Sequence, residues 1–321
     1  MANTSIEWTD KVWNPVTGCT KVSAGCKNCY AGSVANRFFA KEYPPNENGS
    51  LRVFTDVRCH EDRLEAPLHW RKPSRIFVNS MSDLFHKDVP DEFIDRVFAV
   101  TALCPQHTFQ ILTKRPERMR EYMQSRSKSA EFWKKAAPFG WTLADFQGIK
   151  MIPFPLPNVW LGVSVEDQKA ADERIPILLQ TPAAVRFISA EPLLGPVSLR
   201  WKDSVPFGIE HPRHLHPKDD AARRVITDQY DGLRELDWVI CGGESGPGAR
   251  PCDIRWIRSV VEQCKASSVP CFVKQLGANA IDELGKMRGA MFSSRKGGDP
   301  NEWPSDLRVQ EFPFTAGKER G

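Results

Sequence analysis

The amino-acid sequence predicts an α/β fold: a partial, TIM-like barrel of the (β/α)6 type with insertions. Short apolar runs rich in β-branched and aromatic residues recur along the chain, and their length is typical of buried parallel strands. Helical patterns lie between these runs, and this alternation indicates either a barrel or a doubly wound sheet. Polar residues follow nearly every run. A barrel gathers its site from the ends of many strands, so this third observation favours the barrel.

The expected strands, in chain order, are residues 12–16, 75–80, 107–114, 159–164, 185–191, 237–244 and 270–275. Apolar residues at helical spacing predict helices over residues 91–103 and 254–265. Residues 125–157 and 200–236 interrupt the alternation and are expected to be insertions beside the barrel mouth. The C-terminal residues 285–321 are expected to cover the barrel, so that residues 1–321 form one domain.

The composition is that of a soluble globular protein, with 321 residues of which 41% are hydrophobic and 26% are charged. No apolar run approaches the ~20 residues of a membrane span, and the first residues lack the pattern of a signal peptide. We therefore expect a cytoplasmic protein without a membrane partner, in which nine reduced cysteines are available for metal binding or catalysis. The net charge of +4 does not demand a nucleic acid; the basic run 114–120 would tolerate a phosphate-rich partner, and a solvated face is the favoured alternative.

The most informative motif is a cysteine triad near the N-terminus, in which Cys19, Cys26 and Cys29 have the spacing C-x6-C-x2-C. A structural zinc site needs four ligands, whereas three thiolates suit a 4Fe–4S cluster that keeps one iron open. An open iron can bind the amino and carboxylate groups of S-adenosylmethionine (SAM). The alternative is a structural zinc ion with a distant fourth ligand, such as Cys59 or His60.

Two carboxylates follow later strands. Glu191 and Glu244 are expected to point into the barrel mouth and to bind substrate there. The alternative for both is a buried structural ion pair with Arg250 or Lys274.

Cys241 directly precedes the glycine pair 242–243 at the end of a strand, so it is a candidate to face the site as a hydrogen-atom donor. The alternative is a core thiol, which is also the expectation for the other dispersed cysteines: Cys104, Cys252, Cys264 and Cys271. A group of three histidines suits either a metal cluster or a solvated loop: His211, His214 and His216.

Cysteines that follow the first strand of a β/α barrel resemble those of the radical SAM superfamily, whose commonest spacing is C-x3-C-x2-C. The longer first gap is a departure of this chain. The segments SIEWTD (residues 5–10), WNPVTGC (residues 13–19) and GGESGPGARP (residues 242–251) resemble the phage Gp37/Gp68 family of three-Cys-motif proteins, DUF5131. This resemblance runs over most of the chain. The resemblance indicates the family of the chain more than its biochemical function.

Two motifs at strand ends give more specific expectations about the chemistry of the site. The segments SMSD (residues 80–83) and LTKRP (residues 112–116) resemble the S/T-x-T-D and T-K motifs of spore photoproduct lyase-like radical enzymes. These likenesses imply acceptors for the amino group or ribose of SAM in Ser80, Ser82 and Asp83, and a cation for its carboxylate in Lys114. Ser164 and Arg174, at and after the fourth strand, occupy places that resemble the carboxylate and ribose contacts of the radical SAM superfamily. For each residue taken singly, a helix cap or a surface pair is the alternative.

The resulting hypothesis is a radical SAM enzyme that cleaves SAM reductively to a deoxyadenosyl radical. An external donor of the flavodoxin or ferredoxin type would supply the electron. The substrate would be a nucleic-acid base or a nucleotide, in DNA repair or modification. The candidate catalytic residues are Cys241, Glu244 and Glu191. One alternative is a zinc-binding, nucleic-acid-binding protein without radical chemistry, and another is a cluster used only for electron transfer or sensing.

Overall fold

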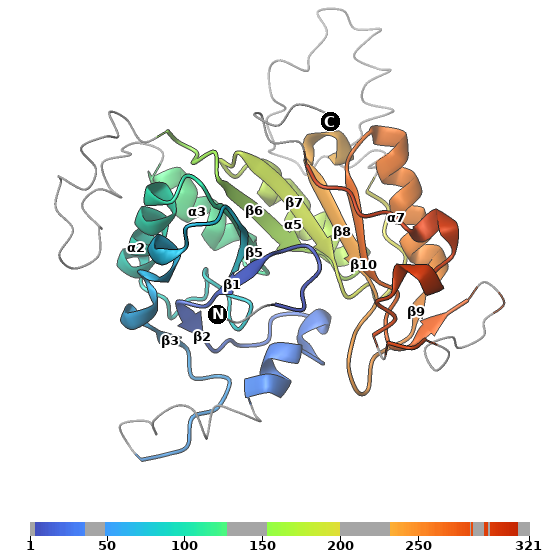
Figure 1. Cartoon of the computed structure of the whole chain (residues 1–321), viewed down its shortest axis with the longest axis horizontal. Coiled ribbons are helices and arrows are strands. Elements are labelled where there is room, and N and C mark those ends of the chain that lie inside the picture. The colour runs from blue at the N-terminus through green and yellow to red at the C-terminus, as the bar shows by residue number, and fades with distance from the viewer. Residues whose placement is uncertain are drawn as a thin grey trace, which may run out of the picture.

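A computed structural model describes residues 4–35, 49–126, 153–199, 232–282, 284, 292–294 and 296–313. Its centre is a seven-stranded sheet with the order β1-β4-β5-β6-β7-β8-β10, in which all neighbouring strands are parallel. In Figure 1 the sheet curls from β1 round to β10 as part of a barrel. The predicted α/β fold with a partial TIM-like barrel is confirmed.

Each strand of this sheet corresponds to one expected strand. They are β1 (Lys11–Trp13), β4 (Arg75–Val78), β5 (Thr108–Thr113), β6 (Val159–Ser164), β7 (Val185–Ala190), β8 (Trp238–Gly242) and β10 (Cys271–Gln275). The first expected strand is divided at Pro15, because proline has no N–H to donate to a neighbouring strand. Beyond it, β2 (Val16–Thr17) pairs antiparallel with β3 (Arg58–Cys59). A second small pair is parallel and joins β9 (Cys252–Asp253) to β11 (Ala280–Ile281).

Helices follow most strands and pack on the outer face of the sheet, as Figure 1 shows. They are α2 (Asp91–Leu103), α3 (Pro116–Arg126), α5 (Gln168–Leu179) and α7 (Ile254–Ser267), and residues 30–35 are also helical. The helix predicted over residues 91–103 is confirmed, and α7 runs two residues beyond its predicted end at Lys265. The short 3₁₀ helices are η1 (Ala24–Cys26), η2 (Glu61–Arg63), η3 (Ala66–His69), η5 (Gly232–Glu235), η7 (Pro300–Glu302) and η8 (Ser305–Leu307).

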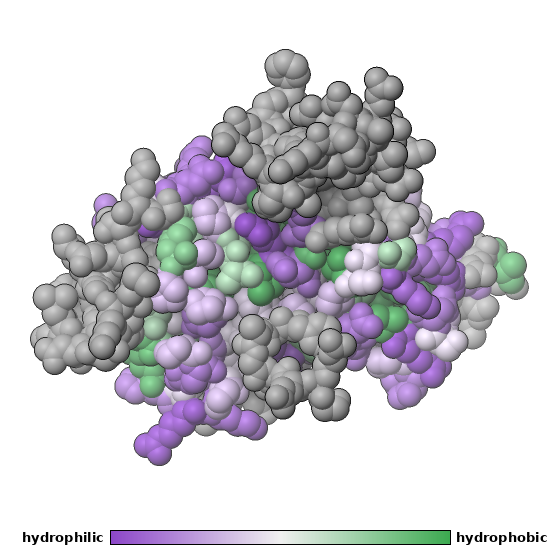
Figure 2. Space-filling view, turned by 90° about the horizontal axis from the view of Figure 1, so that it is seen from above, coloured by the Kyte–Doolittle hydropathy of each residue, from purple (hydrophilic) through white to green (hydrophobic). Residues whose placement is uncertain are grey.

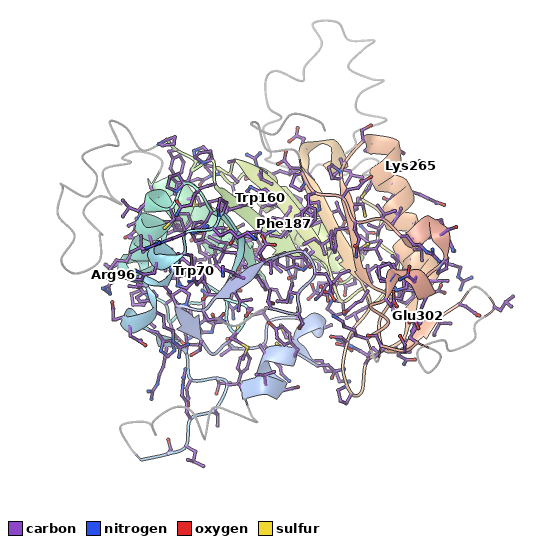
Figure 3. The ribbon with its side chains drawn as sticks, viewed as in Figure 1. Trp70, Arg96, Trp160, Phe187, Lys265 and Glu302 are labelled. Carbon is purple, nitrogen blue, oxygen red and sulfur yellow. The ribbon has the colours of Figure 1, made fainter. Side chains whose placement is uncertain are left out.

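Side chains along each strand alternate between two hydrophobic cores, one on each face of the sheet. On the outer face they pack against the helices. On the concave inner face, aromatic rings fill the space at the level of Trp160, Phe187 and Trp238, the first two of which Figure 3 labels. The ring centroids of Trp160 and Phe187 lie 5.8 and 5.7 Å from that of Trp238. A Cβ on Gly162 would lie 2.6 Å from the Phe187 ring, which explains the glycine within β6.

The concave face is filled near the N-terminal ends of the strands, where Trp8 packs on Phe77 with 4.7 Å between ring centroids. Further along β6, the next inner position after Gly162 is Ser164, because every second residue shares a face. The inner face therefore changes from aromatic to polar toward the C-terminal ends of the strands.

Most residues of the three expected additions to the barrel (125–157, 200–236 and 285–321) lie outside the described residues, and so do the three histidines between 211 and 216. Within the described C-terminal residues, the Glu311 N–H donates to the Cys271 carbonyl at 2.8 Å.

Hydrophilic residues predominate on the described surface in Figure 2, and hydrophobic ones appear in small groups. None of the helices described is both long and apolar enough to cross a membrane.

Candidate functional site

The three cysteines lie on residues 18–29, here called the cysteine loop, which directly follows β2. The Cys19 N–H donates to the Phe54 carbonyl at 2.9 Å, which ties the start of the loop to a neighbouring segment. Gly18 has a φ of +92°, and a Cβ there would lie 2.4 Å from the Asp56 carbonyl oxygen. Only glycine fits this close approach. The cysteine loop is therefore anchored by its backbone at the first cysteine.

A cavity of about 430 Å³ lies beside the cysteine loop, and all three cysteines line it. Each of the three is half-buried. Other walls come from residues at the C-terminal ends of β4, β5 and β6. Five of the six residues expected to contact SAM line the same cavity: Ser80, Ser82, Asp83, Lys114 and Ser164. The sequence motifs that suggested one site are thus adjacent in space.

Asp83 is buried, and four protein groups donate to its carboxylate. Oδ1 accepts from the Thr113 hydroxyl at 2.7 Å and from the Phe85 N–H at 3.0 Å. Oδ2 accepts from the Lys114 N–H at 3.1 Å and from Arg115 Nη1 at 2.8 Å. A carboxylate has about four acceptor positions, so these donors occupy them. Asp83 therefore orders the ends of β4 and β5, and it has no acceptor position left for the cofactor contact expected from the sequence.

Ser80 and Ser82 keep their acceptor capacity. The Ser82 hydroxyl donates to the Val16 carbonyl at 2.8 Å, and the Ser80 hydroxyl donates to Asn14 Oδ1 at 3.2 Å. A hydroxyl that has donated its proton still carries two lone pairs. Both serines can therefore accept hydrogen bonds from a ligand in the cavity.

Arg174 does not line the cavity with the other five. Its Nη1 donates to Glu166 Oε2 at 2.7 Å, and both side chains are buried. Glu166 Oε1 in turn accepts from the Ser23 hydroxyl of the cysteine loop, and a Cβ on Gly25 would lie 2.7 Å from this oxygen. Burial alone would raise the pKa of Glu166, but Lys114 and Arg174 hold it below its ordinary value. Arg174 thus positions a charged carboxylate against the cysteine loop.

Glu244 also holds the cysteine loop. Its Oε1 accepts from Arg250 Nη2 at 2.5 Å, and its Oε2 accepts from Asn28 Nδ2 at 3.0 Å. Arg250 Nη1 donates to the Ala24 carbonyl at 2.8 Å. Burial would raise the pKa of Glu244, but the hydrogen bonds from Arg250 and Asn28 hold it below its ordinary value. The ion pair between Glu244 and Arg250 is one of the alternatives that the sequence left open.

Glu191 likewise forms an ion pair. Its Oε1 lies 2.6 Å from Lys274 Nζ and accepts from Gln275 Nε2 at 3.2 Å. Neither Glu191 nor Glu244 is among the described residues that line the cavity. Both carboxylates are engaged by protein cations, so their geometry is that of structural pairs.

Cys241 lies on the opposite face of the sheet from the one expected. It is fully buried in the outer core together with Cys252, Cys264 and Cys271. The physical reason is the alternation of side chains along β8, which puts Ile240 on the inner face and Cys241 under the helices. A thiol there does not line the cavity. The alternative interpretation as a core thiol is the correct one for Cys241, and Cys104 is buried in the same core.

Asn79 supplies an unpaired donor at the cavity wall. Its side chain is only 2% exposed, and Oδ1 accepts from the Val16 N–H at 3.1 Å. Its Nδ2 is buried and has no hydrogen-bond partner among the described residues, although Asn79 lines the cavity. An unsatisfied buried donor costs about 1–3 kcal/mol. One buried donor beside the cavity is therefore unsatisfied among the described residues.

The three thiols line one cavity, and the described residues form no site for a single metal ion. Among the described residues, no three histidine, cysteine or acidic side chains are grouped closely enough to hold one metal ion. A zinc ion draws its ligands to a single point, whereas in a 4Fe–4S cluster each thiolate binds a different iron. Neither Cys59 nor His60, both described, lines the cavity, and His60 Nε2 is 2.7 Å from the Thr17 hydroxyl. Three thiols around one cavity are the donor set that a cluster bound through three thiolates would use.

Sequence reasoning gave no role to several residues that build the site. Asn79, Arg115 and Glu166 belong to the polar residues that follow the apolar runs, and that pattern alone assigns them no role. Asn28 and Tyr30 were not singled out, although both flank the third cysteine, and the Tyr30 hydroxyl donates to the Ser80 carbonyl at 2.6 Å. Adjacency to a cysteine of the triad is the signal that could have identified these two.

Comparison with known proteins identifies the family. No curated protein and no solved structure matches the chain. A family model described as "Protein of unknown function (DUF5131)" matches residues 3–303, a span that includes the cysteine loop and all seven strands of the sheet. The protein therefore belongs to the DUF5131 family.

Proposed function

We propose that this protein is a radical SAM enzyme in which Cys19, Cys26 and Cys29 hold a 4Fe–4S cluster. The observation that carries the proposal is that the three thiols line one cavity at the C-terminal ends of a parallel half-barrel. β/α barrels gather their active sites at that edge. The chemistry that such a group supplies when bound is the one-electron reductive cleavage of SAM to methionine and a deoxyadenosyl radical.

The chain's own residues would bind SAM and exclude water. Ser80 and Ser82 would accept hydrogen bonds from its amino group or ribose, and Asn79 Nδ2 would donate to one of its oxygens. Lys114 would balance the negative charge of its carboxylate. The aromatic core around Trp238 fills the inner face of the described sheet and would exclude water from that side.

The substrate that we propose is a nucleic-acid base or a nucleotide, in DNA repair or modification. The motif likeness to spore photoproduct lyase-like enzymes supports this class. The charge of the cavity wall supports it too, because the described charged residues that line it are four cations and one acid: Lys21, Lys27, Lys114, Arg115 and Asp83. A cationic cavity attracts phosphate-bearing ligands. An external flavodoxin- or ferredoxin-type protein would deliver the electron.

The proposal is tested by anaerobic reconstitution with iron and sulfide, followed by incubation with SAM and dithionite. We expect brown protein with about four irons per chain and formation of 5′-deoxyadenosine. Cys26→Ala should lose the iron and the product. Cys59→Ala is the matched control, because it removes a half-buried thiol that does not line the cavity. It should behave as the wild type.

A colourless protein that binds one zinc ion and does not cleave SAM would contradict the proposal. Iron without deoxyadenosine would indicate a cluster for electron transfer or sensing. DNA, RNA and free nucleotides are then added separately to the same assay. The proposed substrate class is supported if one of them increases deoxyadenosine formation, and it is wrong if none does.

A further inference from the structure

We infer that Arg115 is a positioning residue that sets the reduction potential of the cluster through Cys19, an inference that rests on the proposed function. Arg115 Nη1 lies 3.6 Å from Cys19 Sγ and 2.8 Å from Asp83 Oδ2. The arginine side chain is 14% exposed and that of Asp83 is 7% exposed. A guanidinium with little exposure to water thus donates a hydrogen bond to a sulfur that would ligate iron.

The guanidinium also fixes the residue after this cysteine. Arg115 Nη2 donates to the Thr20 carbonyl at 3.0 Å and to the Thr20 hydroxyl at 3.1 Å. Two nitrogens of one rigid planar group therefore hold three atoms of the cysteine loop, a geometry that the single ammonium of lysine cannot reproduce.

His86 approaches the same hydroxyl from another side. Its Nε2 lies 2.7 Å from the Thr20 hydroxyl, and its Nδ1 accepts from the Asp88 N–H at 3.2 Å. An Nδ1 that accepts carries no proton, so the proton of the neutral ring is on Nε2 and is donated to Thr20. Burial lowers the pKa of His86, which keeps the ring neutral. Arginine and histidine together leave little freedom for the backbone at Cys19.

The position of Arg115 is itself determined by the sheet. Asp83 receives Arg115 Nη1, while the Thr113 hydroxyl and the Lys114 N–H at the end of β5 hold the other acceptor positions of Asp83. The arginine is therefore oriented before any cluster is bound. Its N–H reaches Cys19 Sγ without a rearrangement of the loop.

This contact acts on the reduction of the cluster. One-electron reduction adds negative charge to the irons, the sulfides and the thiolates. A cationic N–H donor to a ligating sulfur stabilises the more negative state more strongly, and hydrogen bonds to the sulfurs are among the determinants of the potential. The contact is screened less than one at the open surface, because the Arg115 side chain is only 14% exposed and Cys19 is half-buried. Asp83 offsets part of the effect, so removing Arg115 both deletes a cation and leaves an anion beside Cys19.

The test is the midpoint potential of the reconstituted full-length protein, measured by redox titration with electron paramagnetic resonance detection. We expect Arg115→Gln to disfavour reduction by about tenfold, which for one electron is a shift of about 59 mV to more negative potential. Arg115→Lys should shift the potential in the same direction by less, because lysine keeps the positive charge but lacks the planar, two-nitrogen geometry of the guanidinium. If the glutamine variant does not fold, the lysine variant still supplies a cation for Asp83 and can be measured in its place.

The matched control is Arg120→Gln. Arg120 lies on α3, where its Nη1 donates a solvent-exposed hydrogen bond to Gln180 Oε1 at 3.2 Å. It does not line the cavity, so its removal should leave the potential unchanged. Iron content and the thermal unfolding midpoint are measured on each variant first.

Two results would overturn the inference while the proposed function stands. One is iron-loaded Arg115 variants with the wild-type potential. The other is failure of both Arg115 variants to fold or to retain iron, since the arginine would then act in assembly. A wild-type protein that assembles no cluster would instead overturn the proposed function, and the inference with it.

Discussion

Asn28 of the cysteine loop donates a hydrogen bond of 3.0 Å to Glu244, although 216 residues separate them along the chain. Arg250 completes the contact by binding both Glu244 and the Ala24 carbonyl. The loop is thus held on one side by the end of β8 and on the other by Arg115 after β5. Residues from distant strands therefore define where the three thiols lie.

Removing the charge of Glu244 should loosen this contact. We expect Glu244→Gln to lower the free energy of unfolding by about 2 kcal/mol, because Arg250 loses a buried partner. Urea denaturation measures the change. Glu173→Gln is the control, since its pair with Lys169 spans 3.9 Å on the exposed face of α5 and should contribute almost nothing. If Glu244→Gln and Glu173→Gln are equally stable, the contacts of Glu244 do not stabilise the fold as expected.

A side chain at Gly25 should displace the cysteine loop. The Cβ of Gly25→Ala would lie 2.7 Å from Glu166 Oε1, closer than normal contact. We expect a loss of stability of about 1–3 kcal/mol and a reduced iron content after reconstitution. Gly195→Ala is the matched control, because a Cβ there meets nothing within 4 Å. The expectation is wrong if both variants retain iron equally.

Glu166 should make stability depend on pH on the acid side. Burial opposes its charge, but Lys114 and Arg174 hold its pKa below the ordinary value of 4.5. A folded-state pKa that is depressed contributes stability above the unfolded pKa, and this contribution is lost as pH falls through the folded value. Denaturation from neutral pH down to about pH 3 should show a loss in the wild type that is smaller in Glu166→Gln. If the stability of the wild type and that of Glu166→Gln fall equally as pH is lowered, Glu166 does not make the expected contribution.

The unpaired amide of Asn79 should matter for ligand binding more than for folding. Asn79→Asp keeps the Oδ1 that accepts from Val16, and aspartate tolerates the φ of 61° at this position. It removes the free Nδ2 donor and adds a negative charge. We expect SAM affinity to fall at least about tenfold, or 1.4 kcal/mol, by calorimetric titration of the reconstituted protein. Unchanged affinity would exclude Asn79 from the ligand site.

The sheet was predictable because its strands are buried on both faces, which leaves continuous apolar runs such as that of β6. The helix α2 was predictable from its apolar stripe. The helices α3 and α5 were not: α3 buries few apolar residues, and α5 carries Pro176 inside the helix. Composition and periodicity report burial, and α3 is mostly polar while the proline within α5 argues locally against a helix.

The cysteine loop and the strand ends around it were also predictable, since the C-terminal ends of parallel strands meet on one face. Which face a residue near a strand end occupies depends on register, and for that reason the expectation for Cys241 was wrong. Contacts such as Ser23 to Glu166 depend on how the closed fold brings distant segments together. No local pattern in the sequence marks such pairs.

Strands β1 and β10 form the two edges of the described sheet, and no ladder of backbone hydrogen bonds joins them in the described residues. The cysteine loop starts beside β1 and is clamped by residues that follow β8, so it bridges toward the far edge. The separation of the two edges is therefore governed by side-chain contacts. In the part of the chain that the structure describes, side chains and not strand pairing thus join the cysteine loop to the residues after β8.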